Sequence, residues 1–370
     1  MQRSLVVVLT VLVMFGTWQA GAAIITMPGG APTIQQAVES AAPGDTILLG
    51  KGIYQQLIRV DNKPLTIASY FLTTGDSSAI RSTILHGGGI TNDAAIVTTT
   101  GSDTLTLVGL TLTASSDGIQ PFSPLNVRHC VIYGTVDGID YESGSGGFLT
   151  DCLIERNVDD AVDLDEDTQV IIERCILRDN DDDGIEIRLH PWAWDSLRVV
   201  IRDNTITGNG EDGIQFIGYN EDTHRHFRIE NNLIADNEMS AIACMDDSTT
   251  REDYRGAQIP ERIDVIGNTF VNNPYCIVGG AKFRVKDNLF IGSSAAVFRR
   301  VGDGAMLAGN TAWECRMLAE EMGGVRHGFR RIIPRSEGRP GEQWPVNPGV
   351  EGTKRMRWMP AAPAKAQNDE

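Results

Sequence analysis

Residues 128–154 read RHCVIYGTVDGIDYESGSGGFLTDCLI and contain one full period of an internal repeat. The segment begins with Arg-His-Cys-Val-Ile and ends with the similar run Thr-Asp-Cys-Leu-Ile. Between the two runs lies a second unit, Val-Asp-Gly-Ile-Asp (136–140). Alternation of apolar and polar residues in such short runs is typical of half-buried β-strands. The stretch therefore predicts short strands that recur with each repeat.

The same units recur along most of the chain. The first unit returns at intervals of 22, 23, 29, 28, 36, 20 and 22 residues, centred on Cys130, Cys152, Cys175, Asn204, Asn232, Asn268, Asn288 and Asn310. A period of this size with short strands is the signature of a solenoid. Each coil has room for three short strands and three turns, so stacked coils form parallel sheets.

The cysteine pattern follows the repeat. Cys130, Cys152 and Cys175 share one phase and are expected to stack about 4.8 Å apart in an interior column. This spacing leaves a disulfide possible. However, side chains that project in parallel from a stack favour buried thiols that pack as small hydrophobes.

The N-terminal segment TIQQAVESAAPGDTILLGKGIYQQLIRVDNKPLTIAS (33–69) combines an amphipathic helix, a turn and further strands. Together with the repeat, it resembles the entry cap and first coil of right-handed parallel β-helix proteins, the pectate-lyase-like superfamily. The resemblance implies an all-β, right-handed parallel β-helix solenoid with a short N-terminal capping helix. The superfamily includes lyases, hydrolases, epimerases, esterases and non-catalytic surface proteins, so the fold alone does not define the function.

The chain divides into three predicted parts. Residues 1–23 read as a signal peptide, because Arg3 precedes an apolar run (5–15) that ends in small residues. This run is too short to span a membrane, so we expect a secreted or periplasmic protein without a membrane span, although an uncleaved anchor is the alternative. Residues 24–312 are expected to form the β-helix, and 313–370 a C-terminal extension with a disordered tail.

Negative charge is concentrated in one segment. Residues 135–187 hold 17 acids and three arginines, a local net charge of −14, whereas the whole chain carries −17. This charge argues against nucleic acid and anionic membranes as partners. It favours a cation, a cationic partner, or an anionic substrate bridged by a cation.

Alternation within the acidic strands predicts which side chains face outward. Stacking then produces two outward columns, Gln120–Asp140–Asp163–Glu186–Gln215 and Glu142–Asp165–Arg188–Ile217. We interpret the five acids as a calcium site, because dense oxygen-only ligands suit this ion. The candidate ligands are Asp140, Glu142, Asp163, Asp165 and Glu186. The alternative is a solvated surface, and the acids before glycine, such as Asp183, are expected to serve turns.

Three longer intervals place extra residues after the acidic strands. These insertions are expected to form a wall beside the acids, and their aromatic and basic side chains suit sugar rings and uronate carboxylates. The candidate substrate-binding residues are Trp192, Trp194, Tyr219, His224 and Arg225. Alternatively, the tryptophans cover a sheet edge.

The resemblance implies a calcium-dependent lyase-like enzyme on an acidic polysaccharide. Lyases of this fold place calcium and a basic side chain on one outward strand face; the ion acidifies the C5 proton of the uronate and the base removes it. Arg188, beside Glu186, fits that layout as the catalytic residue. Because the pKa of an arginine normally exceeds about 12, His190 is the alternative base, with His224 next.

Two other functions remain open. A non-catalytic, calcium-stabilised glycan-binding or surface protein explains the acids but not the aromatic wall. A polygalacturonase-like hydrolase would use Asp137 with Asp159 and Asp160, whose motifs have similar spacing. That family carries a histidine where this chain has Asp183, and its Arg-Ile-Lys motif is missing here.

Overall fold

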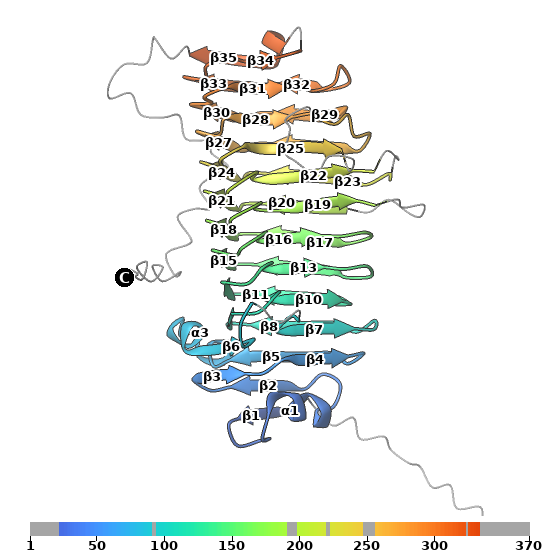
Figure 1. The fold of residues 1–370 in the computed structure, drawn as a ribbon, viewed down its shortest axis with the longest axis vertical. Coiled ribbons are helices and arrows are strands. Elements are labelled where there is room, and N and C mark those ends of the chain that lie inside the picture. The colour runs from blue at the N-terminus through green and yellow to red at the C-terminus, as the bar shows by residue number, and fades with distance from the viewer. Residues whose placement is uncertain are drawn as a thin grey trace, which may run out of the picture.

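Each coil of the chain adds one short strand to each of three parallel sheets, and the coils stack into an elongated column (Figure 1). The structure is a computed structural model that describes residues 22–90, 94–190, 198–219, 223–246, 256–322 and 325–333. The predicted parallel β-helix is thus confirmed, and its sheets are named A, B and C below.

The strands of each sheet are given in stacking order, which follows the chain. Sheet A contains β1 (Ile24–Met27), β2 (Thr46–Leu49), β5 (Leu65–Ser69), β8 (Leu105–Val108), β11 (Pro124–Arg128), β14 (Gly146–Thr150), β17 (Gln169–Glu173), β20 (Arg198–Arg202), β23 (His226–Glu230), β26 (Arg262–Ile266), β29 (Lys282–Lys286) and β32 (Met306–Ala308). Sheet B contains β3 (Gly52–Gln55), β6 (Thr83–His86), β9 (Thr111–Thr113), β12 (Val131–Tyr133), β15 (Leu153–Glu155), β18 (Ile176–Arg178), β21 (Thr205–Thr207), β24 (Leu233–Ala235), β27 (Thr269–Val271), β30 (Leu289–Ile291), β33 (Asn310–Trp313) and β35 (Phe329–Ile333). Sheet C contains β4 (Ile58–Asp61), β7 (Val97–Thr100), β10 (Ile119–Phe122), β13 (Ile139–Tyr141), β16 (Val162–Leu164), β19 (Glu186–Leu189), β22 (Ile214–Gly218), β25 (Ser240–Asp246), β28 (Tyr275–Val278), β31 (Ala296–Arg299) and β34 (Ala319–Glu320).

The central cysteines lie in one interior column, as predicted. Cys130, Cys152 and Cys175 are fully buried, and each precedes a strand of sheet B that pairs in register with the next. The backbone N–H of Cys130 lies 3.4 Å from Sγ of Cys152. All six cysteines are free thiols. The column therefore contributes apolar packing and not cross-links.

Two ladders of buried asparagines support the turns. In the ladder that the repeat predicts, Nδ2 of Asn204 donates to Oδ1 of Asn232 at 3.0 Å, and the pattern continues through Asn268 and Asn288 to Asn310. The second ladder, which the sequence analysis did not identify, stands where sheet B leads to sheet C and comprises Asn157, Asn180, Asn209, Asn237 and Asn273. These bonds satisfy polar groups that the closed stack excludes from water.

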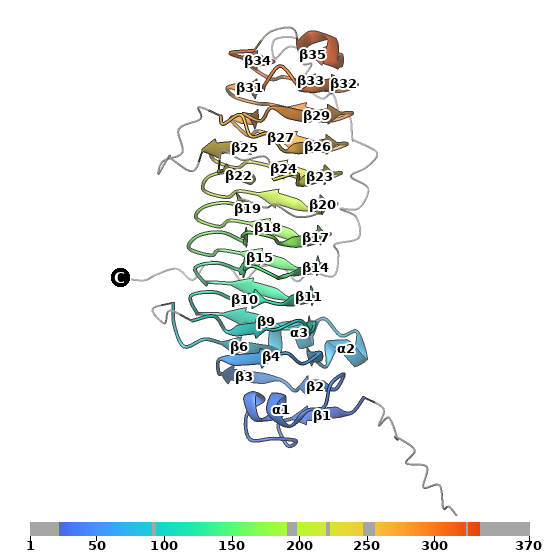
Figure 2. The same ribbon diagram turned by 90° about the vertical axis from the view of Figure 1, so that its right-hand side faces the viewer.

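A short helix covers the N-terminal end of the stack, as expected. Helix α1 (Ile34–Ser40) begins after Thr33, whose side chain accepts from the backbone N–H of Gln36 at 3.1 Å. Its apolar residues Ile34, Ala37 and Val38 are buried against the first coils. Two further helices, α2 (Phe71–Thr74) and α3 (Ser78–Ser82), lie beside the early coils (Figure 2).

The stack extends beyond residue 312, where its end was predicted. Strand β34 pairs with β31, and β35 pairs with β33 after the 3-10 helix η1 (Val325–Gly328). The ring of Phe329 lies 5.9 Å from Phe298 and 6.1 Å from Phe290, so this last coil closes the core. The asparagine marker used for the prediction ends at Asn310, whereas strand pairing continues to β35.

Both predicted terminal segments lie largely outside the described residues. These are positions 1–21 of the predicted signal peptide and positions 334–370 of the predicted C-terminal extension. In the part of the chain that the structure describes, no helix is long and apolar enough to cross a bilayer.

Candidate functional site

The acidic strip, defined as Asp140, Glu142, Asp163, Asp165 and Glu186, lies on the outer face of sheet C. Strand pairing places Asp140 beside Asp163 and Asp163 beside Glu186, which confirms the first predicted column. Apolar neighbours on the same strands, such as Val162 and Ile187, are buried in the core. The period-two pattern therefore holds the acids together on consecutive coils.

Arg188 is the cation of the strip. Its Nε atom lies 3.5 Å from Oδ2 of Asp163 and 3.5 Å from Oδ1 of Asp165. Its Nη2 atom also contacts Oε1 of Glu186. The guanidinium side chain remains 39% exposed, whereas the side chains of Asp163 and Glu186 are only 11% and 10% exposed. One half-exposed cation thus faces three carboxylates, two of which are almost fully buried.

Burial changes the protonation of the strip. Removal from water raises the pKa of Asp163 to about 9; neighbouring Glu186 adds to the increase and Arg188 opposes it. Burial also raises the pKa of Glu186, again opposed by Arg188. For Asp140, burial and then the charge of Asp165 raise the pKa. Burial therefore disfavours a full set of negative charges on the strip unless a cation lies among them.

A second set of acids, which the sequence analysis did not assign to the calcium site, lies just inside the strip. Asp160 is 4% exposed, and burial together with the charge of Glu186 raises its pKa well above the usual value. Its Oδ1 accepts the backbone N–H of Asp183 at 2.8 Å, and Oδ1 of Asp183 accepts that of Asp212 at 2.7 Å. The recurrence of an acid just before each outward strand was the signal available in the sequence.

The oxygen atoms of these acids fit a cation. Asp140, Asp163 and Asp165 offer oxygens that all lie within 4.8 Å of one another, and so do Asp160, Asp163 and Glu186. Within the described residues, Oδ1 of Asp163 has no hydrogen-bond partner. A compact set of carboxylates with an unpartnered buried oxygen suits calcium, which prefers several oxygen ligands.

Glu142 stands apart from these two groups. Its Oε1 accepts from Nε2 of Gln120 at 2.8 Å, and the same nitrogen lies 3.2 Å from Oδ2 of Asp140. Glu142 is thus a neighbour of the strip whose carboxylate already has a neutral partner.

His190 lies at the exit of β19, close to the strip. Its Nδ1 accepts the backbone N–H of Glu166 at 3.4 Å and lies 3.9 Å from Oδ1 of Asp165. The ring of Tyr219 packs on that of His190 with centroids 4.5 Å apart. Tyr219, which was predicted to bind substrate, thus lies against the imidazole of His190.

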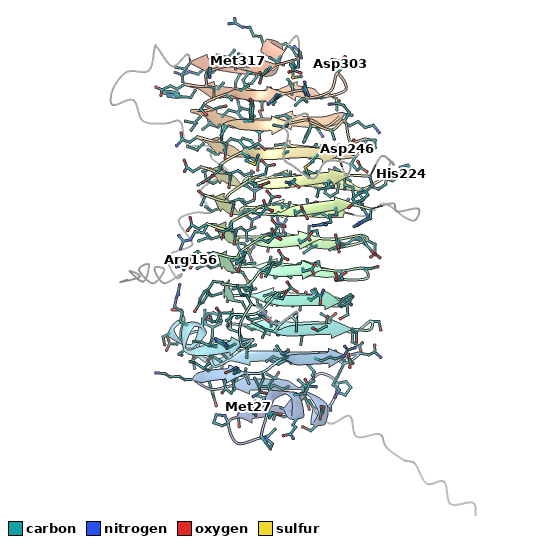
Figure 3. The ribbon with its side chains drawn as sticks, in the orientation of Figure 1. Met27, Arg156, His224, Asp246, Asp303 and Met317 are labelled. Carbon is teal, nitrogen blue, oxygen red and sulfur yellow. The ribbon has the colours of Figure 1, made fainter. Side chains whose placement is uncertain are left out.

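The other predicted substrate-binding residues differ in position. His224 is exposed at the edge of the stack (Figure 3). Arg225 is only 4% exposed and its Nη2 donates to the backbone oxygen of Glu166, so it supports a turn and does not face solvent, contrary to the prediction. A loop residue lacks the strand alternation that would have revealed its direction. Trp192 and Trp194 lie outside the described residues.

The residues that a polygalacturonase-like hydrolase would need are only partly in place. Asp159, Asp160 and Asp182 offer oxygens within 4.8 Å of one another. Burial, followed by the charge of Asp159, raises the pKa of Asp137 to about 7. However, Asp183, which occupies the position of the hydrolase histidine, is 0% exposed and cannot reach a substrate.

Comparisons with known proteins agree with this architecture. A family profile described as "Right handed beta helix region" matches residues 69–191 and 188–290. No curated protein sequence matches the chain. Among solved structures, pectate lyase Pel9A is similar with a TM-score of 0.57 at 14% identity, over 78% of this chain and 79% of that chain. The A-module of the Azotobacter vinelandii mannuronan C-5 epimerase AlgE6 gives a TM-score of 0.49 at 14% identity, over 81% of this chain and 91% of that chain.

At these identities, the likeness to solved structures concerns the fold alone. The family profile is evidence of family membership, because its two matched segments together span more than half of the chain. With the three parallel sheets, this match shows that the chain belongs to the right-handed β-helix family.

Proposed function

We propose that the protein is a calcium-dependent, lyase-like enzyme that acts on acidic, uronate-containing polysaccharides outside the cytoplasm. The observation that carries this proposal is the cluster of buried carboxylates around the half-exposed guanidinium of Arg188. A fold shared with a pectate lyase is consistent with it. The predicted signal peptide supports the location.

Asp140, Asp163, Asp165 and Glu186 would hold calcium, with Asp160 behind them. When bound, calcium supplies Lewis acidity that withdraws charge from a uronate carboxylate and makes the C5 proton easier to remove. The carboxylates of this chain keep the ion on the outer face of sheet C, where a polymer has access.

Arg188 serves as a charge-stabilising residue and not as the base. Burial lowers the pKa of its guanidinium, but Asp163, Glu186 and Asp165 raise it by more, so the side chain stays protonated. A fixed positive charge beside the reacting sugar stabilises the carbanion that forms when C5 loses its proton.

His190 is the proton acceptor in this proposal. Its ring is held by Tyr219 and its side chain is 31% exposed. The contact between Nδ1 and the N–H of Glu166, at 3.4 Å, is at the long end of hydrogen bonding, so a substrate proton can compete for this nitrogen.

The second candidate is a non-catalytic protein that binds acidic glycans through the same calcium site. The deep burial of Asp163 and Glu186 favours it, because such ligands stabilise a structure whether or not a base is present. His190 distinguishes the two functions, since only the enzyme needs its imidazole.

The test is release of an unsaturated, ultraviolet-absorbing product from pectate, alginate and glycosaminoglycans in calcium. We expect product from at least one polymer, and its loss with a chelator, with His190→Ala and with Arg188→Ala. If calcium-loaded protein binds a polymer but yields no product, the binding function is the better account. Full activity of Arg188→Ala would contradict the role given to that residue.

A further inference from the structure

A groove on the outer face of sheet A offers a second binding surface. It has a volume of about 330 Å³ and spans strands β8, β11, β14 and β17. Pairing places Asn126 beside Phe148 and Arg128 beside Thr150, so the four side chains lie on adjacent coils in two neighbouring outward columns. Figure 2 shows sheets A and C on opposite sides of the stack, which separates this groove from the acidic strip.

One aromatic side chain lines the groove. Phe148 is 50% exposed, although the chain has ample core positions for an aromatic ring. An exposed ring beside polar groups is the arrangement that binds the apolar C–H face of a sugar. The volume lies near the lower end of the range for small-molecule sites, so the groove fits one sugar unit of a chain.

The polar rim carries an uncommitted positive charge. Arg128 is exposed and forms no ion pair with another described residue, whereas the neighbouring Arg174 is engaged by Asp151 and Glu173. The planar donors of Arg128 match a carboxylate from a ligand.

Neutral donors also line the groove, together with Glu173, whose carboxylate is paired with Arg174 and Arg202. The carboxamide of Asn126 and the hydroxyl of Thr150 make no side-chain hydrogen bond within the described part of the chain, and both line the groove. Their position between Phe148 and Arg128 suits the hydroxyl groups of a sugar that rests on the ring.

We propose that the sheet A groove binds one uronate residue of an acidic polysaccharide, with the carboxylate on Arg128 and the sugar face on Phe148. The identity of the polymer rests on the proposed function, but the binding does not depend on calcium, because Arg128 supplies the positive charge. The groove thus holds a stretch of polymer that does not occupy the strip and keeps the protein on its substrate.

The experiment measures binding of saturated galacturonate and mannuronate disaccharides by calorimetry. Excess chelator keeps calcium off the acidic strip, so that the strip does not bind the disaccharides. We expect saturable binding of one disaccharide that weakens roughly tenfold or more in Arg128→Gln and in Phe148→Ala. Arg198→Gln, which removes the same charge from an exposed position of the same sheet outside the groove, should bind like the wild type. All three positions are surface-exposed, and unchanged melting temperatures will show that the variants fold.

Two results would overturn the proposal. One is the absence of saturable binding by the wild type in chelator, and the other is unchanged affinity in both groove variants. The outcome is independent of catalysis: binding in chelator without product in calcium would refute the lyase and leave the groove site standing. Release of product in calcium without binding in chelator would refute the groove site and leave the lyase standing.

Discussion

Arg188 and calcium are expected to compete for the same oxygens, so Arg188→Gln should raise the affinity for calcium. The guanidinium contacts Asp163, Asp165 and Glu186, three of the proposed ligands. The substitution keeps a polar side chain of similar length but removes the charge. The strip then loses its only internal counterion among the described residues of its two columns.

The size of the effect follows from the contacts. A pair of unit charges about 4 Å apart is worth about 4 kcal/mol at an effective dielectric constant near 20. Because the Arg188 side chain is 39% exposed, solvent reduces each contact to about 1 kcal/mol. Loss of two or three such contacts should therefore strengthen calcium binding on the order of 10- to 100-fold.

Calorimetric titration with calcium at neutral pH measures this change directly. Arg202→Gln is the matched control, because Arg202 pairs with Glu173 on sheet A and its loss changes the net charge equally. In chelator, Arg188→Gln should also melt at a lower temperature than the wild type, since the carboxylates then repel one another without compensation. A calcium affinity of Arg188→Gln equal to or weaker than that of the wild type would refute the competition. If Arg202→Gln gained as much calcium affinity as Arg188→Gln, the effect would be one of net charge and not of the contacts in the strip.

Three further predictions concern the strip and the interior. Asp163→Asn combined with Asp165→Asn should abolish the increase in melting temperature that calcium gives the wild type, and identical wild-type curves in calcium and chelator would rule out the site. Asn232→Ala should lower the free energy of unfolding in urea by about 3 kcal/mol, because the Asn232 side chain bonds to Asn204, Ile201 and Asn268; a loss below about 1 kcal/mol would mean that water replaces it. Burial raises the pKa of the Asp212 carboxyl to about 7 in the folded protein, whereas the same group has a pKa near 4 in the unfolded chain. The protonated carboxyl therefore contributes its full stability below pH 4, and this contribution is lost as the pH rises through 7. Asp212→Asn should therefore reduce the fall in unfolding free energy between pH 5 and 9 by about 3 kcal/mol, and an unchanged slope would assign that fall to other groups.

The strands and their outward columns could be predicted because two periods reinforce each other. Alternation along each strand gave the direction of Asp140 and Asp163, and the long repeat gave the coil on which each lies. The second asparagine ladder was missed, although the same repeat contains it. The second asparagine ladder recurs at intervals of 23, 29, 28 and 36 residues from Asn157 to Asn273, which match intervals of the first unit.

Other features of the site could not be predicted from periodicity. Asp160 and Asp183 lie in turns before the strands, where alternation does not define direction, and their burial depends on the next coil packing over them. The same holds for Arg225 in a loop. The outward position of Asp163 was predicted correctly, but its low exposure arises from neighbours on three coils at once. Burial of this kind is a property of the stack and not of any one segment.

The two proposed binding surfaces overcome the repulsion between the acidic protein and an acidic polymer in different ways. A strongly acidic chain repels a polyanion, so each contact needs local positive charge. At the strip, the charge would come from calcium held by buried carboxylates, so binding there should saturate with calcium and change little with moderate salt. At the sheet A groove, the charge is the exposed guanidinium of Arg128, which is screened over about 8 Å at physiological ionic strength. Salt should therefore weaken binding at the groove first, and at high ionic strength the polymer would remain bound through the strip alone.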